Sequence, residues 1–285
     1  MGVRSFRLGS HRWAGHPGVR SGEALTYPRA FLRRATGVTS SLSPGCVVTW
    51  ADLDGLPEPV VRYLRFMDVV GAPRTGSLLA SAHGRFRMRP DGRWMACRAW
   101  QLNTVVPVRR LFHMHLRIAP GIAMSGWDTY SDGDGHMRGT LFGAIPVVSG
   151  TGPHFAASEL VTWLNDAVLL APSMLLDPAV VLREDEDGDW FGVEVTDGGR
   201  TVAARVLVDG NGAPRDFWTD DRYADLPGGL VRARWHTPVD HWTAVDGRPL
   251  PVGAKAVWLL AGGAFTYAEL EFDEVVLDPP AIARP

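Results

Sequence analysis

The chain contains one long stretch, residues 152–177, in which apolar positions recur with helical rather than strand spacing. Five apolar residues follow the i, i+3, i+4, i+7 and i+8 pattern and share one face: Leu160, Trp163, Leu164, Ala167 and Val168. Four polar residues fall on the other side: Glu159, Thr162, Asn165 and Asp166. Pro172 disfavours the helical conformation at Ala171, so the pattern predicts a central helix that ends there.

A second amphipathic helix is predicted nearer the N-terminus, from the sequence LPEPVVRYLRF at residues 56–66. Prolines stand at its start, and apolar residues with helical spacing form one stripe: Val60, Tyr63, Leu64 and Met67. Two amphipathic helices need an apolar surface to cover them.

The rest of the chain alternates apolar and polar residues with a period of two, interrupted by Gly and Asp turns, which predicts strands joined by hairpins. Five runs precede the central helix: about 78–89, 93–104, 109–119, 122–131 and 136–143. Seven follow it: about 179–185, 189–197, 200–208, 213–223, 231–243, 250–260 and 264–276. The alternation is clearest in LFHMHLRI, where Phe112, Met114 and Leu116 face one side and His113 and His115 the other.

These elements predict an α+β fold that is mostly antiparallel β. About 11–12 strands cannot stay flat, so we expect a single strongly curved sheet, a half-barrel, wrapped around the central helix and the N-terminal helix. A closed barrel or a two-sheet sandwich is the alternative. The predicted half-barrel domain spans residues 49–278, followed by a short tail at 279–285.

Residues 1–48 are rich in arginine and lack a sustained hydrophobic period, which predicts a disordered tail, or an extension foreign to the native protein. Arg33-Arg34 followed by Cys46 suggests an export signal as an alternative. The residues between them are rich in Thr and Ser where a signal needs an apolar run, so we expect a cytoplasmic protein.

Composition narrows the class of partner. A formal net charge of −2 gives no general attraction to nucleic acid, and two cysteines without a CxxC motif give no disulfide framework or zinc ribbon. No membrane-spanning helix and no cofactor are expected. The eleven tryptophans indicate either the packing of a broad sheet or an aromatic ligand pocket.

Three segments carry a resemblance to a known family: LPEPVVRYLRF, the central SELVTWLNDAV, and the C-terminal pieces VDGRPLP and EFDEV. Together they resemble an uncharacterised bacterial family with a domain of unknown function. The C-terminal part is also loosely similar to Lol-type lipoprotein carriers. That resemblance implies an open half-barrel whose concave face holds acyl chains beneath helices, and it implies no catalytic motif.

We therefore expect a non-enzymatic module that holds a small hydrophobic or lipid-like ligand between sheet and helix. The candidate ligand-binding residues are Trp163, Arg98, Trp100, Glu159, Trp127, Trp235 and Trp258. One alternative is a hydrolase-like enzyme that uses acid–base residues in the same cavity: Glu159, Asn165 and Asp166, with Arg98. A fully packed structural or partner-binding domain is the other alternative.

His113 and His115 are the best candidates for a metal site, because alternate strand positions place two imidazoles on the same side. A third ligand is not evident from the spacing. We therefore interpret them as solvated residues on the polar side of the strand.

Overall fold

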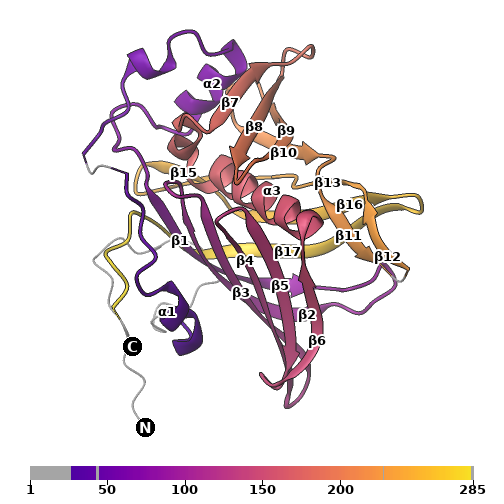
Figure 1. The fold of residues 1–285 in the computed structure, drawn as a ribbon. Coiled ribbons are helices and arrows are strands. Elements are labelled where there is room, and N and C mark those ends of the chain that lie inside the picture. Colours follow the sequence, from indigo (N-terminus) through magenta and orange to yellow (C-terminus); the bar gives the residue numbers. More distant parts are fainter. Residues whose placement is uncertain (1–26, 43–44, 227, 284–285) are drawn as a thin grey trace.

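The structure is a computed structural model that describes residues 27–42, 45–226 and 228–283. Within this part of the chain, thirteen antiparallel strands form one strongly curled sheet (Figure 1). The strand order across it is β6-β5-β4-β3-β2-β1-β17-β16-β13-β10-β9-β8-β7. The first strand pairs with the last, β17, so the two halves of the chain join in the middle of the sheet. The predicted curved half-barrel is confirmed.

The first half of the sheet is a six-stranded meander: β1 (Ser77–Phe86), β2 (Met95–Thr104), β3 (Arg109–Ala119), β4 (Ile122–Ser131), β5 (Asp134–Leu141) and β6 (Ile145–Thr151). The second half contains β7 (Val180–Glu184), β8 (Trp190–Asp197), β9 (Arg200–Val208), β10 (Pro214–Thr219), β13 (Arg234–His236), β16 (Gly253–Leu260) and β17 (Gly263–Leu277). Two hairpins stand outside the main sheet: β11 (Tyr223–Leu226) with β12 (Gly229–Arg232), and β14 (Trp242–Val245) with β15 (Arg248–Pro251).

Three α-helices are α1 (Arg29–Ala35), α2 (Glu58–Phe66) and α3 (Pro153–Leu170), and two 3-10 turns are η1 (Trp50–Leu53) and η2 (Pro172–Leu176). Both predicted helices are present. None of the helices in the described residues is long and apolar enough to cross a membrane.

The sheet curls until the β4–β5 turn meets the β8–β9 turn. A Cβ added to Gly198 would lie 2.3 Å from the Cα of Gly133, so only glycine fits this close approach. Beside it, the hydroxyl of Tyr130 donates a hydrogen bond of 2.8 Å to the carboxylate of Asp197. This contact brings distant parts of the sheet together near the start of α3.

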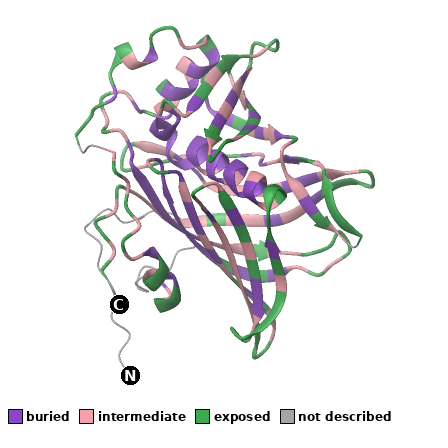
Figure 2. Cartoon of the chain, in the orientation of Figure 1, coloured by how far each residue is buried: buried purple, intermediate pink, exposed green. Residues whose placement is uncertain are grey.

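Helix α3 fills the concavity of the curled sheet and is buried around most of its circumference (Figure 2). Its apolar stripe packs in the main core, where Tyr63 of α2 donates a hydrogen bond of 2.7 Å to the carbonyl of Val168. Its polar positions are not solvated either, since Glu159 and Asn165 are both buried. A buried polar helix face needs partners on the sheet, and these partners define the candidate site.

Helix α1 packs on the convex side of the sheet, opposite α3. Phe31 and Ala35 are fully buried there, against Leu79, Leu102 and Leu111 of the first three strands. The prediction of a disordered tail over 1–48 is therefore wrong for residues 29–35, because these few apolar side chains find a matching patch. The first 26 residues of that predicted tail lie outside the described residues.

Candidate functional site

A cavity of about 350 Å³ lies between the concave face of the sheet, α3 and the β11–β12 hairpin. Its volume is within the range of small-molecule pockets, roughly 300–1,000 Å³. Most of its lining is apolar, and aromatic rings surround it: Phe86, Phe112, Phe155, Trp235, Trp258, Phe265, Tyr267 and Phe272. Such a lining favours an apolar guest over water.

Methionines are concentrated in the same wall. Met88, Met114, Met124 and Met137 line the cavity, which is four of the eight methionines in the chain. Methionine is unbranched and polarizable, so it adapts its shape to an irregular or flexible partner. The wall therefore suits a flexible apolar chain better than one rigid shape.

A buried ionic cluster lies beneath the polar side of α3. Arg110 of β3 bonds through Nη1 to Oε2 of Glu159 at 2.7 Å, and through Nε to Oδ2 of Asp166 at 3.2 Å. Asn103 of β2 donates a further bond of 2.9 Å to the same oxygen of Asp166. Breaking a buried ion pair is costly, because it leaves a charge without a partner. These contacts therefore fix the rotation of α3 against β2 and β3.

Carboxyl groups outnumber guanidinium groups around this cluster. Glu159, Asp166 and Asp128 face Arg110 and Arg222, so full ionisation would leave an uncompensated negative charge. Desolvation and the neighbouring Asp128 raise the pKa of Glu159 to about 8, against the opposing attraction of Arg110. Arg110 itself stays charged, because its carboxylate neighbours outweigh desolvation and raise its pKa. Both pKa values are raised, which keeps Arg110 charged and favours the protonated, neutral form of Glu159. The pKa of Asp128 is raised by desolvation too, and the excess of carboxyl groups explains why an acid in this cluster holds a proton.

Arg222, in the segment before β11, lies over the rings of Trp235 and Trp258. Its guanidinium carbon is 4.2 Å from the ring centre of Trp235, and its Nη1 donates to the hydroxyl of Tyr267 at 3.3 Å. Trp235 donates through Nε1 to the same hydroxyl at 3.1 Å. Nε of Arg222 has no hydrogen-bond partner in the described residues. This arginine thus leaves one buried donor without a partner beside the cavity.

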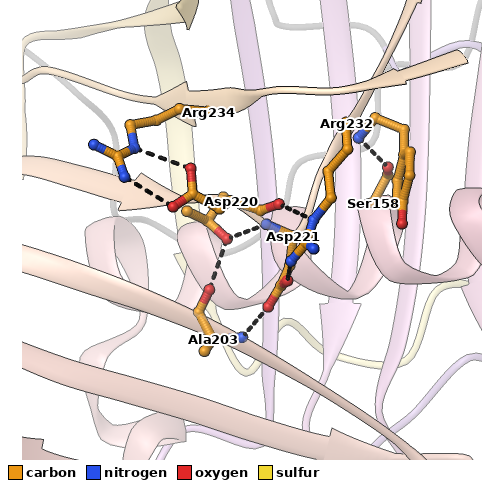
Figure 3. Close-up of polar contacts among 8 residues, drawn as sticks. Ser158, Ala203, Asp220, Asp221, Arg232 and Arg234 are labelled. Atoms are coloured by element: carbon orange, nitrogen blue, oxygen red, sulfur yellow. Dashed lines mark hydrogen bonds and ion pairs between the residues drawn. The ribbon is translucent and has the colours of Figure 1, made fainter.

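The β11–β12 hairpin forms one side of the cavity through Leu226 and Leu230. Figure 3 shows how its base is fixed: Arg232 donates to the carbonyl of Asp220 and to the carboxylate of Asp221, both at 2.7 Å. The backbone N–H of Tyr223 donates to Oγ of Ser158 on α3 at 3.3 Å. The hairpin is therefore anchored at its base, whereas Leu230 is 39% exposed near its tip.

The structure brings together only some of the residues predicted from the sequence. Trp235 and Trp258 line the cavity. Glu159 does not line it, but it bonds to Arg110, which does. Trp163 does not line it: this side chain is 1% exposed in the main core, and its Nε1 donates to the carbonyl of Thr104 at 2.9 Å.

The other three predicted residues lie on the convex face. Trp100 and Trp127 pack around His113 beneath α1, with ring centres 5.7 Å and 3.8 Å from that imidazole. Arg98 stands three positions before the cavity-lining Gln101 in β2, so its side chain is on the opposite, convex side, where it is exposed. The placement of Arg98, Trp100 and Trp127 in the concavity is thus corrected by the alternation of strand β2.

The interpretation of His113 as a solvated residue is also wrong. It is 1% exposed between the two tryptophans, and burial lowers its pKa to about 4. His115 is exposed, as expected. Among the described residues, no group of three or more His, Cys, Asp or Glu side chains is arranged to hold a metal ion.

Sequence reasoning missed four polar residues of the site: Gln101, Arg110, Asp128 and Arg222. A signal for Arg110 was available, because it has the same strand parity as Phe112 and Met114 and so lies on their face. Arg98, the arginine chosen instead, has the same parity as Trp100. For Arg222, in a segment between strands, periodicity offers no comparable signal.

The model of a family of unknown function, DUF6544, matches residues 46–270. The chain belongs to this family. The resemblance inferred from the three sequence segments is therefore confirmed. No curated protein matches the chain.

Solved structures give a weaker likeness. A LolA superfamily protein from Nitrosomonas europaea is 12% identical with a TM-score of 0.38, over 82% of this chain and 96% of that chain. A DUF1329 family protein from Desulfovibrio piger is 13% identical with a TM-score of 0.38, over 82% of this chain and 94% of that chain. A likeness at this level does not carry function from one protein to another.

Proposed function

We propose that this protein is a binding module that holds a hydrophobic or lipid-like molecule in the cavity between the sheet and α3. The observation that carries the proposal is the cavity itself, about 350 Å³ bounded largely by aromatic and methionine side chains. Protein interiors are otherwise packed to the density of organic crystals, and an apolar void forfeits the contacts of its lining. A guest that fills the void would restore those contacts.

The neighbouring core supports this reading. Beside the cavity, the apolar stripe of α3 is tightly enclosed, with Leu160, Leu164 and Val168 all fully buried. The sequence therefore supplies enough apolar volume to fill the space on one side of the helix. On the other side, long flexible methionines and flat rings leave room, which favours a role in ligand binding over a fully packed structural domain.

A cavity-filling substitution tests the proposal directly. Gly126 of β4 lines the cavity, and a Cβ added there would have only the carbonyl oxygen of Met114 within 4 Å, at 3.9 Å. Gly126→Leu should therefore be tolerated by the backbone and project its side chain into the empty space. We expect the wild type to bind the neutral apolar dye Nile red with a rise in fluorescence, and Gly126→Leu to lose roughly tenfold or more in affinity.

Gly192→Leu is the matched control. Gly192 lies on the outer face of β8, where an added Cβ would meet Arg183 at an ordinary 3.6 Å. This variant should bind the dye like the wild type. Native mass spectrometry of protein purified from its own host should also show an extra mass that Gly126→Leu lacks. A wild type that binds no dye and carries no extra mass would refute the proposal.

A further inference from the structure

Three polar side chains around the cavity have hydrogen-bonding groups that the described residues leave without a partner. Gln101 is only 7% exposed and lines the cavity, yet its amide makes no hydrogen bond to any described residue. Asp128 lines the cavity, and its carboxyl group likewise makes no hydrogen bond within the described part of the chain. Arg222 uses one donor on Tyr267 and leaves its Nε unpartnered. Buried polar groups are normally satisfied, so these unused ones indicate a missing partner.

The register of the sheet places two of these groups in one row. Gln101 of β2 pairs with Phe112 of β3, which pairs in turn with Asp128 of β4. The amide and the carboxyl therefore flank the Phe112 ring on the concave face. Arg222 approaches from the segment before β11, near enough to act on the Asp128 carboxyl but without an ion pair to it in the described residues. All three side chains line the same cavity, so a polar group of a ligand held there would lie beside them.

The charge of the surroundings limits what that group can be. The pKa values of Glu159 and Asp128 are both raised, so with one proton shared between these two acids the two remaining negative charges balance the guanidinium groups of Arg110 and Arg222. A ligand group with a full charge of either sign would disturb this balance next to the buried cluster. Burying an unpaired charge costs far more than burying a neutral group that forms hydrogen bonds.

We propose that this polar end of the cavity recognises the head group of an amphiphile, and that the head group is uncharged and carries both hydrogen-bond donors and acceptors. A glycerol ester and a fatty amide share this chemistry. The amide of Gln101 offers both a donor and an acceptor, Asp128 accepts, and Arg222 donates. The apolar tail lies along the methionine wall. This inference rests on the proposed function and specifies its ligand class.

Amphiphiles with one tail and different heads test the inference. Lauroylglycerol, laurate and dodecylamine would each be titrated at about pH 7 against bound Nile red, below their micelle-forming concentrations, with dodecane as the headless reference. We expect lauroylglycerol to displace the dye at roughly tenfold lower concentration than either charged amphiphile. Tighter binding of laurate or dodecylamine would overturn the inference.

Gln101→Leu provides the decisive variant, because it removes the amide at nearly constant size and breaks no hydrogen bond within the described structure. The variant should lose roughly tenfold in affinity for lauroylglycerol while its affinity for dodecane stays unchanged. An equal loss for all ligands, or no loss, would refute the head-group role and leave the cavity proposal standing. If dodecane and every amphiphile fail to displace the dye, both proposals fail together.

Discussion

The two faces of strands β2, β3 and β4 are built from alternate residues of the same sequence, but one face is closely packed and the other borders a cavity. On the convex face, Trp100, His113 and Trp127 stack together, and α1 covers the adjacent apolar patch with Phe31. On the concave face, Gln101, Phe112 and Asp128 border an open cavity although a longer helix lies beside them. Both faces carry aromatic and polar groups, but only one of them is filled.

The difference lies in the covering helix more than in the strands. Helix α1 places its two buried side chains, Phe31 and Ala35, directly on the sheet, and both of them are apolar. Helix α3 turns Glu159 and Asp166 toward the sheet, and these residues hold it through Arg110. An ionic attachment fixes the helix without filling the space around it. The same strands can therefore support a closed packing on one side and a binding space on the other.

The largest effect is expected from a residue of the filled core. Trp163→Ala should destabilise the protein by about 3–5 kcal/mol, because it removes a fully buried aromatic and leaves the carbonyl of Thr104 without its donor. Urea unfolding would measure this loss. Since Trp163 does not line the cavity, Nile red affinity should be unchanged under conditions in which the variant is folded.

Trp258→Ala is the comparison for that experiment, because Trp258 does line the cavity. Its truncation should cost less stability than Trp163→Ala and should change Nile red affinity. If Trp163→Ala weakened dye binding more than Trp258→Ala, the separation of the packed core from the cavity would be wrong.

A smaller loss is expected on the convex face. Phe31→Ala should reduce the free energy of unfolding by about 3 kcal/mol, since this ring is fully buried although it belongs to a short helix. Dye affinity should not change, because α1 lies on the opposite side of the sheet from the cavity. Arg33→Ala on the exposed side of α1 should alter neither property. A Phe31→Ala protein as stable as the wild type would show that α1 is not part of the folded domain.

Much of the fold could be predicted because long periodic segments carry a strong signal. The helical spacing of Leu160, Trp163 and Leu164 predicted α3, and the hairpin turns predicted the curved antiparallel sheet. Helix α1 was missed because it is only seven residues long, with two fully buried side chains among arginines. Strand β6 was missed because it is a largely exposed edge strand, whose Ile145 is 55% exposed.

The candidate site could be predicted only in part. Trp235 and Trp258 were identified from an excess of tryptophan, but the same reasoning selected Trp100 and Trp127, which face away from the cavity. Strand periodicity says which residues share a face, and it does not say which face meets which helix. That choice depends on the partner of each face: α1 on the convex side and the Arg110 cluster on the concave side.

The smallest expected effect is the pH dependence of stability that comes from the proton on Glu159. The pKa of Glu159 is raised to about 8 in the folded protein from an ordinary value near 4.5, so the native state binds more protons than the unfolded state between these values. Wild-type stability should therefore fall as the pH rises from about 5 to about 8. Glu159→Gln keeps the uncharged form and should lose much less stability across the same range. Glu194→Gln, on the outer face of β8, should follow the wild type. Urea unfolding at several pH values would measure the difference. Parallel curves of stability against pH for the wild type and Glu159→Gln would show that the buried carboxyl is ionised throughout. That result would also remove the charge balance that favours an uncharged head group.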